Sequence, residues 1–335
     1  MNIGVIGCGY WGPNLVRNFN ILPDVRVTAI SDLRQERLDY ISRLYPNIEI
    51  ASTDCNDILK NNDIQAVVIA TPVSTHYPLA MEALDNGKHV LLEKPLTSTT
   101  EQAEVLIEMA ERKNLVLMVD HTFLYTGAVQ KIKEIVDSGD LGDIYYFDSV
   151  RVNLGLFQHD VNVIWDLAAH DVSIMDHLLN SPPRAVSATG VAHFEQGIEN
   201  MAYISVQYDN NVIGHIHVNW LAPVKVRKTL LCGSKKMVVY DDTEPSEKVK
   251  VYDKGVDYVE NKEDVYNLLV QYRTGDMTAP HINLTEALNL ISSEFVASIN
   301  ENRKPLTDGA AGLRVVRILE EANNSLQAGG RVIEL

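Results

Sequence analysis

The first 120 residues alternate short apolar runs with longer segments whose apolar residues recur at helical spacing. Runs that are apolar throughout are typical of parallel strands buried on both faces. Their alternation with helices predicts an α/β fold with a doubly wound parallel sheet. The predicted strands are Ile3–Ile6, Val25–Ser31, Ala66–Ala70, His89–Leu92 and Val116–Val119, and the predicted helices are Asn14–Asn20, Gln35–Leu44, Pro78–Asn86 and Thr100–Lys113.

The pattern changes after Asp120. Several strands then follow one another with turn residues but no helices between them, which predicts an antiparallel sheet. We therefore expect two domains, residues 1–120 and residues 121–335. The second part is predicted to hold helices at Ala128–Ser138, Ile164–Leu179, Leu284–Asn300 and Ala311–Ala328, and strands at Ala185–Phe194, Met201–Tyr208, Val212–Trp220, Val226–Cys232 and Met237–Tyr240.

A G-x-G-x-x-G turn lies between the first predicted strand and helix. Gly7 permits a sharp turn, Gly9 lets a pyrophosphate approach the backbone, and Gly12 permits close helix–strand packing. Asp32 ends the next strand, where a carboxylate accepts from ribose hydroxyls and repels a 2′-phosphate. This predicts NAD as the cofactor, although Arg34 leaves room for NADP.

Two further motifs carry candidate chemistry. Lys94, in Glu93-Lys94-Pro95, follows a strand at the sheet edge where ligands bind in this architecture. Asp166 and His170 are four residues apart on a predicted helix, so the carboxylate can orient the imidazole as a general base requires. From the residues alone, Lys94 fits a solvated lysine paired with Glu93 equally well, and a plain surface Asp–His pair is favoured.

Composition excludes several classes of function. The 335 residues carry 29 Lys and Arg against 45 Asp and Glu, a formal net charge of −16, which opposes non-specific nucleic-acid binding. Three scattered cysteines fit neither a disulfide framework nor a zinc site, and suit a reducing cytoplasm. His215 and His217 lack a third spaced ligand, so no metal site is predicted. No apolar stretch is long enough for a membrane span, so we expect a soluble cytoplasmic protein without a membrane partner.

Taken together, the motifs resemble the Gfo/Idh/MocA family of nicotinamide-dependent oxidoreductases, over nearly the whole chain. The resemblance rests on the glycine turn, on Ala70-Thr71-Pro72 with His76, on Glu93-Lys94-Pro95 and on Asp166-x-x-x-His170. It implies a Rossmann domain followed by an α+β domain with a large, mostly antiparallel open sheet, and a homodimer or homotetramer. Many relatives carry a glycine between the Asp and the His, where this chain has Leu167-Ala168-Ala169.

The resemblance also assigns roles to residues. His170 is implied as the catalytic acid/base, Lys94 as the group that polarises the reacting oxygen, and Asp166 as the group that orients the site. The implied cofactor-binding residues are Gly7, Gly9, Tyr10, Trp11, Gly12, Asp32, Leu33, Thr71, Pro72, His76, Glu93 and Lys94.

Later segments resemble the branch that acts on nucleotide sugars. They imply oxidation of the C3 hydroxyl of UDP-N-acetylglucosamine or its uronate, giving a ketone for transamination in lipopolysaccharide or surface polysaccharide biosynthesis. A diphosphate needs cationic donors, although each candidate fits a solvated surface residue equally well. Alternatives are a dehydrogenase or ketoreductase of a free sugar or inositol, and a non-catalytic NAD-binding regulator. The candidate substrate-binding residues are Arg151, Lys225, Arg227, Tyr272 and Arg273.

Overall fold

The computed structural model describes residues 1–155, 158, 160–194, 197–258 and 270–335. The chain forms two compact units, each made of two segments. Met1–Tyr125 and Thr285–Glu320 make the first unit, and Thr126–Leu284 and Glu321–Leu335 make the second. The division predicted at residue 120 does not include this return of the chain to the first unit. Among the described residues, every helix is too short or too polar to cross a membrane.

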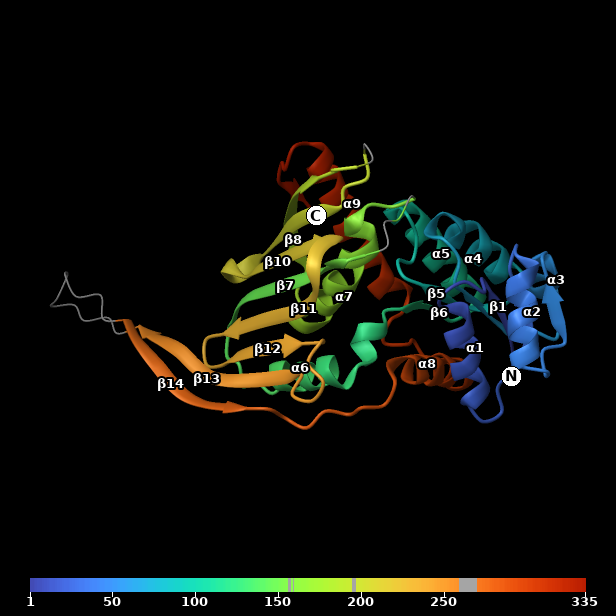
Figure 1. Ribbon diagram of the computed structural model, residues 1–335, viewed down its shortest axis with the longest axis horizontal. Coiled ribbons are helices and arrows are strands. Elements are labelled where there is room, and N and C mark those ends of the chain that lie inside the picture. The colour runs from blue at the N-terminus through green and yellow to red at the C-terminus, as the bar shows by residue number, and fades with distance from the viewer. Residues whose placement is uncertain (156–157, 159, 195–196, 259–269) are drawn as a thin grey trace. The chain divides into compact units, whose positions relative to one another are not determined.

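The first unit is built on a six-stranded parallel sheet (Figure 1). Its strand order, β3-β2-β1-β4-β5-β6, confirms the predicted doubly wound topology. The strand order reverses between the parallel neighbours β1 and β4, and in this architecture ligands bind at this switch point, beyond the carboxyl ends of the strands. The strands are β1 (Asn2–Ile6), β2 (Arg26–Ser31), β3 (Ile50–Ser52), β4 (Ala66–Ile69), β5 (His89–Glu93) and β6 (Leu117–Asp120).

Helices connect and cover these strands. The Thr99 hydroxyl caps α5 by accepting from the Gln102 N–H at 3.3 Å. The returning segment packs α8 against α1, where the rings of Phe295 and Phe19 meet edge to face, 6.2 Å apart. The helical segments of this unit are α1 (Gly12–Ile21), α2 (Gln35–Leu44), α3 (Asn56–Leu59), η1 (Val73–Thr75), α4 (His76–Asp85), α5 (Thr100–Lys113), η2 (Thr122–Tyr125) and α8 (Ala287–Glu301).

The second unit contains a nine-stranded sheet in the order β14-β13-β12-β11-β7-β10-β9-β8-β15. Its neighbours pair antiparallel except for β7 and β10, which are parallel. The mostly antiparallel open sheet is thus confirmed. The strands are β7 (Ile144–Leu154), β8 (Pro183–Val191), β9 (Met201–Tyr208), β10 (Ile213–Asn219), β11 (Leu221–Gly233), β12 (Met237–Asp241), β13 (Val249–Tyr258), β14 (Val270–Thr278) and β15 (Ile333–Glu334).

Helices of the second unit cover one face of this sheet. Figure 1 shows α7 beside β7 and β10, and the Met175 sulfur of α7 sits where a side chain at Gly214 would project. The last turns of α9 pack on β8, where the Ser325 hydroxyl accepts from the Ala188 N–H at 2.9 Å. The helical segments are α6 (Gly127–Asp137), η3 (Ile164–Ala168), α7 (Ala169–Leu179), η4 (Asp209–Asn211) and α9 (Gly309–Gln327), whose N-terminal part belongs to the first unit.

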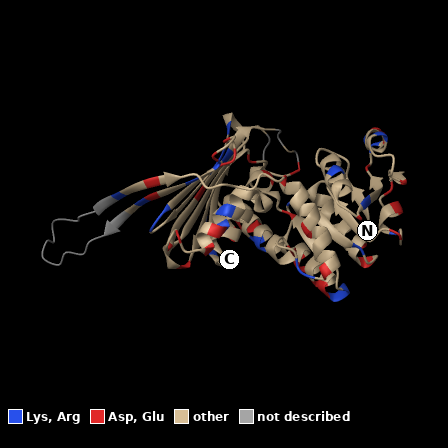
Figure 2. Cartoon of the chain, turned by 90° about the horizontal axis from the view of Figure 1, so that it is seen from below, with Lys and Arg blue, Asp and Glu red and all other residues tan. Residues whose placement is uncertain are grey.

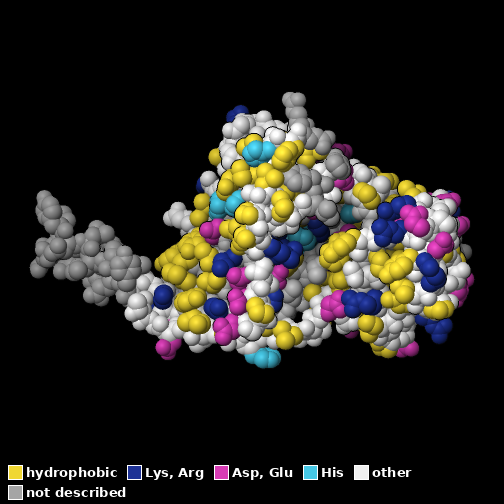
Figure 3. Space-filling model, viewed as in Figure 1, with side chains coloured by type: hydrophobic (Ala, Val, Ile, Leu, Met, Phe, Trp, Pro, Cys, Tyr) yellow, Lys and Arg dark blue, Asp and Glu magenta, His cyan; other side chains and the backbone are white. Residues whose placement is uncertain are grey.

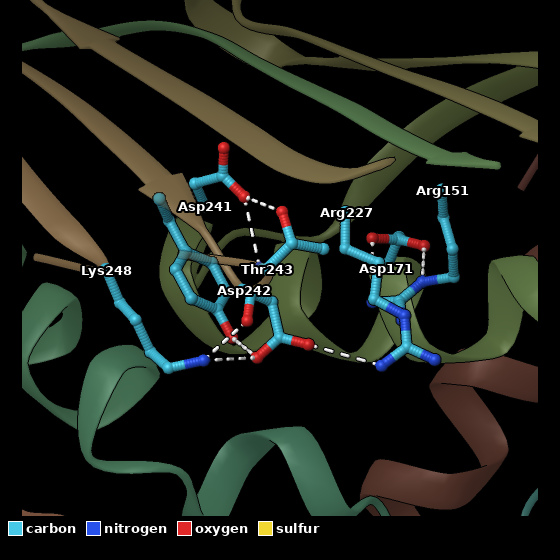
Figure 4. A network of polar contacts seen from close by, with 8 residues as sticks. Arg151, Asp171, Arg227, Asp241, Asp242, Thr243 and Lys248 are labelled. Carbon is cyan, nitrogen blue, oxygen red and sulfur yellow. Dashed lines mark hydrogen bonds and ion pairs between the residues drawn. The ribbon is translucent and has the colours of Figure 1, made fainter. Parts of the chain in front are cut away.

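The central strand β7 was not predicted, because its buried face is partly polar. Ser149 and Arg151 both point into the unit and are almost completely buried. Asp171 of α7 binds both side chains. Its carboxylate accepts from Arg151 Nε at 2.6 Å (Figure 4) and from Arg151 Nη2 at 3.2 Å. It also accepts from Ser149 Oγ at 2.6 Å. This buried ion pair links helix α7 to β7 in the middle of the sheet.

Charged and apolar side chains are both distributed over the two units. Acidic and basic residues are interspersed along the helices and strands in Figure 2 rather than gathered in one block. Apolar side chains form small groups on the viewed face of both units in Figure 3.

The buried ion pair predicts a large effect of a single substitution. Asp171→Ala leaves the Arg151 guanidinium charged and uncompensated in the interior, and we expect it to lower the free energy of unfolding by about 3–5 kcal/mol. Asp85→Ala, which removes an exposed partner of Lys113, is the control and should have a much smaller effect. Urea denaturation of both variants measures the difference, and equal shifts would contradict this account of the pair.

Candidate active site

The glycine turn after β1 is shaped by backbone contacts. Gly7 has a φ of +98°, and a Cβ there would lie 2.4 Å from the Ala70 carbonyl oxygen. A Cβ at Gly12 would lie 2.2 Å from the Gly7 carbonyl oxygen. At Gly9 the nearest atom would be the Arg34 guanidinium at 3.8 Å, so this position faces open space. The first and third glycines are therefore required by packing, and the second leaves the backbone accessible.

Asp32 lies beside this turn at the end of β2. Its Oδ2 accepts from the Cys8 N–H at 2.7 Å, and its Oδ1 accepts from the Arg34 N–H at 2.9 Å. Burial acts to raise the pKa of Asp32, but these backbone bonds and the Arg34 guanidinium outweigh it and hold the pKa below its ordinary value. The turn is thus flanked by a fixed, ionised carboxylate.

Apolar side chains around the turn are left uncovered. Tyr10 is 81% exposed and Leu33 is 90% exposed. The rings of Tyr10 and Trp11 meet edge to face at 5.2 Å. All three residues are among those that the resemblance assigns to the cofactor, and they form an apolar surface next to the phosphate-binding turn.

His76 joins the loops that follow β4 and β5. Its imidazole is buried, and its two ring nitrogens lie 2.9 Å from the carbonyl oxygens of Thr71 and Pro95. Burial lowers the pKa of His76. His76 therefore links the Ala70-Thr71-Pro72 motif to the Glu93-Lys94-Pro95 motif and fixes their positions at the sheet edge. Its direct contact with a cofactor remains a prediction from the sequence.

Two acidic side chains, Glu93 and Asp120, lie at the same edge of the sheet. Glu93 and Asp120 are paired residues at the ends of the neighbouring parallel strands β5 and β6. Lys94 follows Glu93 directly, and its N–H donates to Glu93 Oε2 at 3.2 Å. The Thr122 hydroxyl donates to Asp120 Oδ1 at 2.6 Å. The sequence analysis assigned Glu93 and Lys94 but missed Asp120, whose signal was its place at the end of the last parallel strand.

His121, the next residue, is buried and neutral. Burial, together with the charges of Lys94 and Arg314, lowers its pKa to about 3. Within the described part of the chain, neither of its ring nitrogens has a hydrogen-bond partner. A neutral imidazole offers one N–H and one lone pair, so His121 adds a donor and an acceptor to this edge.

In the second unit, Asp166 lies in a segment that was predicted as regular helix. The structure instead has a π-helix over Ile164–Ala168, followed by α7 from Ala169. The predicted single helix Ile164–Leu179 was therefore wrong in its first five residues. The side chain of Asn162 lies just before this segment, and its Oδ1 accepts from the N–H groups of Ile164 and Trp165 in the first turn. Single π-helical turns are frequent at functional sites.

Trp220 positions the Asp166 side chain. Its indole Nε1 donates to Asp166 Oδ2 at 3.0 Å, and the tryptophan is almost completely buried. His170 lies in the first turn of α7, directly after the π-helix. Sequence reasoning assigned Asp166 and His170 but missed Trp220, whose signal was its place as the last residue of the predicted strand Val212–Trp220.

The candidate substrate-binding cations of the second unit have different surroundings. Lys225 is exposed on β11. Arg227 donates to Asp242 at 3.2 Å (Figure 4), and Arg273 donates to Asp253 at 3.2 Å and to the Lys235 carbonyl oxygen. Arg151, paired with Asp171, is buried in the sheet. The side chain of Tyr272 lies outside the described residues.

The two strand histidines have hydrogen-bonding and stacking partners. His215 Nδ1 lies 3.0 Å from Asp148 Oδ1, and the rings of His217 and Tyr203 stack at 4.4 Å. Across the described segments of the chain, no three or more His, Cys, Asp or Glu side chains lie close enough to hold a metal ion.

Comparison with known families identifies the chain. Residues 1–121 match a family model described as the Gfo/Idh/MocA oxidoreductase family, NAD-binding Rossmann fold, and residues 129–239 match the model of its C-terminal domain. The chain belongs to the Gfo/Idh/MocA family. The resemblance seen in the sequence is therefore confirmed, as are the class of enzyme, an oxidoreductase, and the NAD-binding Rossmann fold.

Individual relatives are distant but cover the whole chain. A UDP-N-acetylglucosamine 3-dehydrogenase of Acidithiobacillus ferrooxidans is 25% identical over 98% of this chain and 98% of its own length. Its solved structure superposes with a TM-score of 0.82 at 24% identity, over 98% of each chain. A scyllo-inositol 2-dehydrogenase (NADP⁺) of Bacillus subtilis is 23% identical over 97% of this chain and 93% of its own. The structural likeness supports the fold of this family member.

The geometry at Asp32 predicts which cofactor is preferred. Asp32→Ser removes the carboxylate that repels a 2′-phosphate and leaves the exposed Arg34 guanidinium free to contact it. We expect the ratio of kcat/KM for NADP to that for NAD to rise by about tenfold or more. A tenfold change corresponds to a free-energy difference of about 1.4 kcal/mol between the two cofactors. Initial rates with the two cofactors measure this ratio. Arg34→Ala in the same background should reverse the gain, and an unchanged ratio would contradict the role of Asp32.

Proposed function

We propose that the protein is an NAD-dependent dehydrogenase that oxidises the C3 hydroxyl of a nucleotide sugar, UDP-N-acetylglucosamine or its uronate. Full-length likeness to a UDP-N-acetylglucosamine 3-dehydrogenase, in a chain that keeps Lys94, Asp166 and His170, carries the proposal. The ketone product then suits a transaminase in surface polysaccharide biosynthesis.

The residues around the glycine turn fit NAD. The open backbone at Gly9, the ionised Asp32 and the exposed rings of Tyr10 and Trp11 provide places for the pyrophosphate, the ribose and an apolar base. Thr71 and Pro72 follow β4 at the switch point of the sheet. Bound there, NAD supplies a hydride acceptor at its nicotinamide ring.

The chain's own residues handle the proton and the developing charge. His170 takes the proton of the C3 hydroxyl as general base, and Lys94 stabilises the negative charge on the oxygen as the C–H bond breaks. Asp166, held by the Trp220 indole, orients the imidazole. These roles rest on the family resemblance.

A nucleotide diphosphate requires cations in a protein of net charge −16. Lys225, Arg227 and Arg273 are the candidates, because guanidinium and ammonium groups match phosphate oxygens. Arg227 and Arg273 are each held by a carboxylate, Asp242 and Asp253 respectively, which keeps the guanidinium in a fixed orientation. Arg151 is committed to Asp171 and takes no part in the proposal.

A second candidate is a dehydrogenase of a free sugar or inositol. The likeness to a scyllo-inositol 2-dehydrogenase, over nearly the same length, supports it. A free polyol has no diphosphate, so this alternative leaves Arg227 and Arg273 without a role in substrate binding. We further propose that the protein works as a homo-oligomer, as the family resemblance implies.

The proposed base predicts a separation between turnover and cofactor binding. His170→Asn removes the proton acceptor and is expected to lower kcat by roughly 100-fold or more, while the affinity for NAD changes little. His177→Asn, further along the same helix α7, is the matched control. Steady-state rates and NAD titration measure the two effects. A fully active His170→Asn enzyme would exclude His170 as the base.

The substrate class is tested by NADH formation with a panel of UDP-sugars, dTDP-sugars, free sugars and inositols. We expect oxidation of UDP-N-acetylhexosamines, with an aminotransferase added to remove the ketone. Arg273→Ala should raise the KM for the nucleotide sugar roughly tenfold, because a charged hydrogen bond to phosphate is lost, and should leave NAD binding intact. Turnover of free polyols alone would favour the second candidate instead.

A further inference from the structure

The acidic pair at the ends of β5 and β6 presents a charge problem. Glu93 and Asp120 lie opposite each other in the parallel register at the sheet edge, where Asp120 is buried and Glu93 is half-buried. Two ionised carboxylates side by side in a water-poor site repel each other strongly. The Lys94 ammonium favours the ionised form of both groups. A proton on one of the two carboxyl groups removes the repulsion between them.

The hydrogen bonds indicate which carboxyl group holds that proton. Asp120 Oδ1 already accepts from the Thr122 hydroxyl at 2.6 Å, which favours an ionised Asp120. Asp120 Oδ2 is buried and, among the described residues, no N–H or hydroxyl group donates to it. The Glu93 carboxyl, at the paired position of β5, is the neighbouring side chain that can supply a proton to it. A proton on Glu93 gives an O–H···O hydrogen bond between the two groups and satisfies the buried oxygen.

The electrostatic balance agrees with this arrangement. Burial, and then the Asp120 charge, raise the pKa of Glu93 well above its ordinary value. Burial raises the pKa of Asp120 to about 6, against the opposing effects of Thr122 and Lys94.

Other titratable groups near this edge are His121 and Tyr125. His121 follows β6 and is affected by the charges of Lys94 and Arg314. Burial raises the pKa of Tyr125, and the Asp120 charge helps to raise it. The His121 imidazole is neutral and adds no charge to the pair.

We propose that Glu93 and Asp120 share a single proton, which Glu93 donates to Asp120, and that the remaining negative charge on Asp120 positions the Lys94 ammonium for turnover. This inference rests on the proposed function only for the role of Lys94. The shared proton is a property of the first unit itself. Asp120 is accordingly a positioning residue that acts through Lys94.

The proton is tested directly, without substrate, by ¹³C NMR of the full-length protein labelled at its Glu and Asp carboxyl carbons. The wild-type protein should show a Glu carbon that stays protonated at neutral pH, and Glu93→Gln should remove that signal. A second carbon should titrate near pH 6 and disappear in Asp120→Asn. A Glu93 carbon that is ionised throughout the neutral range would overturn the shared proton, whatever substrate the enzyme uses.

The positioning role is tested by comparing the two isosteric variants. Glu93→Gln keeps a donor to Asp120 and the charge that faces Lys94, whereas Asp120→Asn removes that charge. We expect Asp120→Asn to lower kcat roughly tenfold more than Glu93→Gln does, and to shift the pH profile of kcat, with little change in the affinity for NAD. Equal losses, or a greater loss in Glu93→Gln, would contradict the role of Asp120. Thermal denaturation shows that each variant is folded.

Discussion

The close approach of backbone segments at Gly7 is the constraint on which the first unit depends. The Gly7 N–H donates to the Ser31 carbonyl oxygen at 2.8 Å, and no side chain fits between Gly7 and Ala70. One residue thus touches the ends of both strands that flank β1. The glycine turn, Asp32 and the loop after β4 are brought to one edge by this contact. Without it, the residues assigned to the cofactor would have no common position.

The energetic cost of burying acidic side chains is offset in three different ways. Asp32 is held ionised by backbone N–H groups, and Asp171 is paired with the Arg151 guanidinium. Glu93 and Asp120 lie side by side with Lys94 as a neighbouring cation, and we infer that a shared proton removes their repulsion. In each case nearby donors, cations or a proton offset the cost of burying the carboxyl group.

The sequence predicted those parts of the fold whose buried residues are apolar. The first sheet followed from its apolar runs, except for β3, whose three residues form no run. Strand β7 was missed because the polar residues Ser149 and Arg151 point inward. Their burial is explained by their hydrogen bonds to Asp171, which lies 20 residues beyond Arg151. Strands β13 and β14 were not predicted either. The motifs gave the candidate residues. Trp220 and Asp120 lie at strand ends, but their roles depend on Asp166 and Glu93, partners distant in sequence that the local pattern does not identify.

The return of the chain to the first unit has a consequence for how the protein folds while it is being translated. Residues 285–320 supply α8, whose Phe295 packs on Phe19, and Arg17 pairs with Glu286 at the same contact. A ribosome releases the N-terminal strands long before these residues are made. The nascent first unit therefore exposes the apolar surface of α1 while strands β7 to β14 of the second sheet are synthesised. Its folding is completed only near the end of translation, so a truncated chain lacks part of both units rather than one.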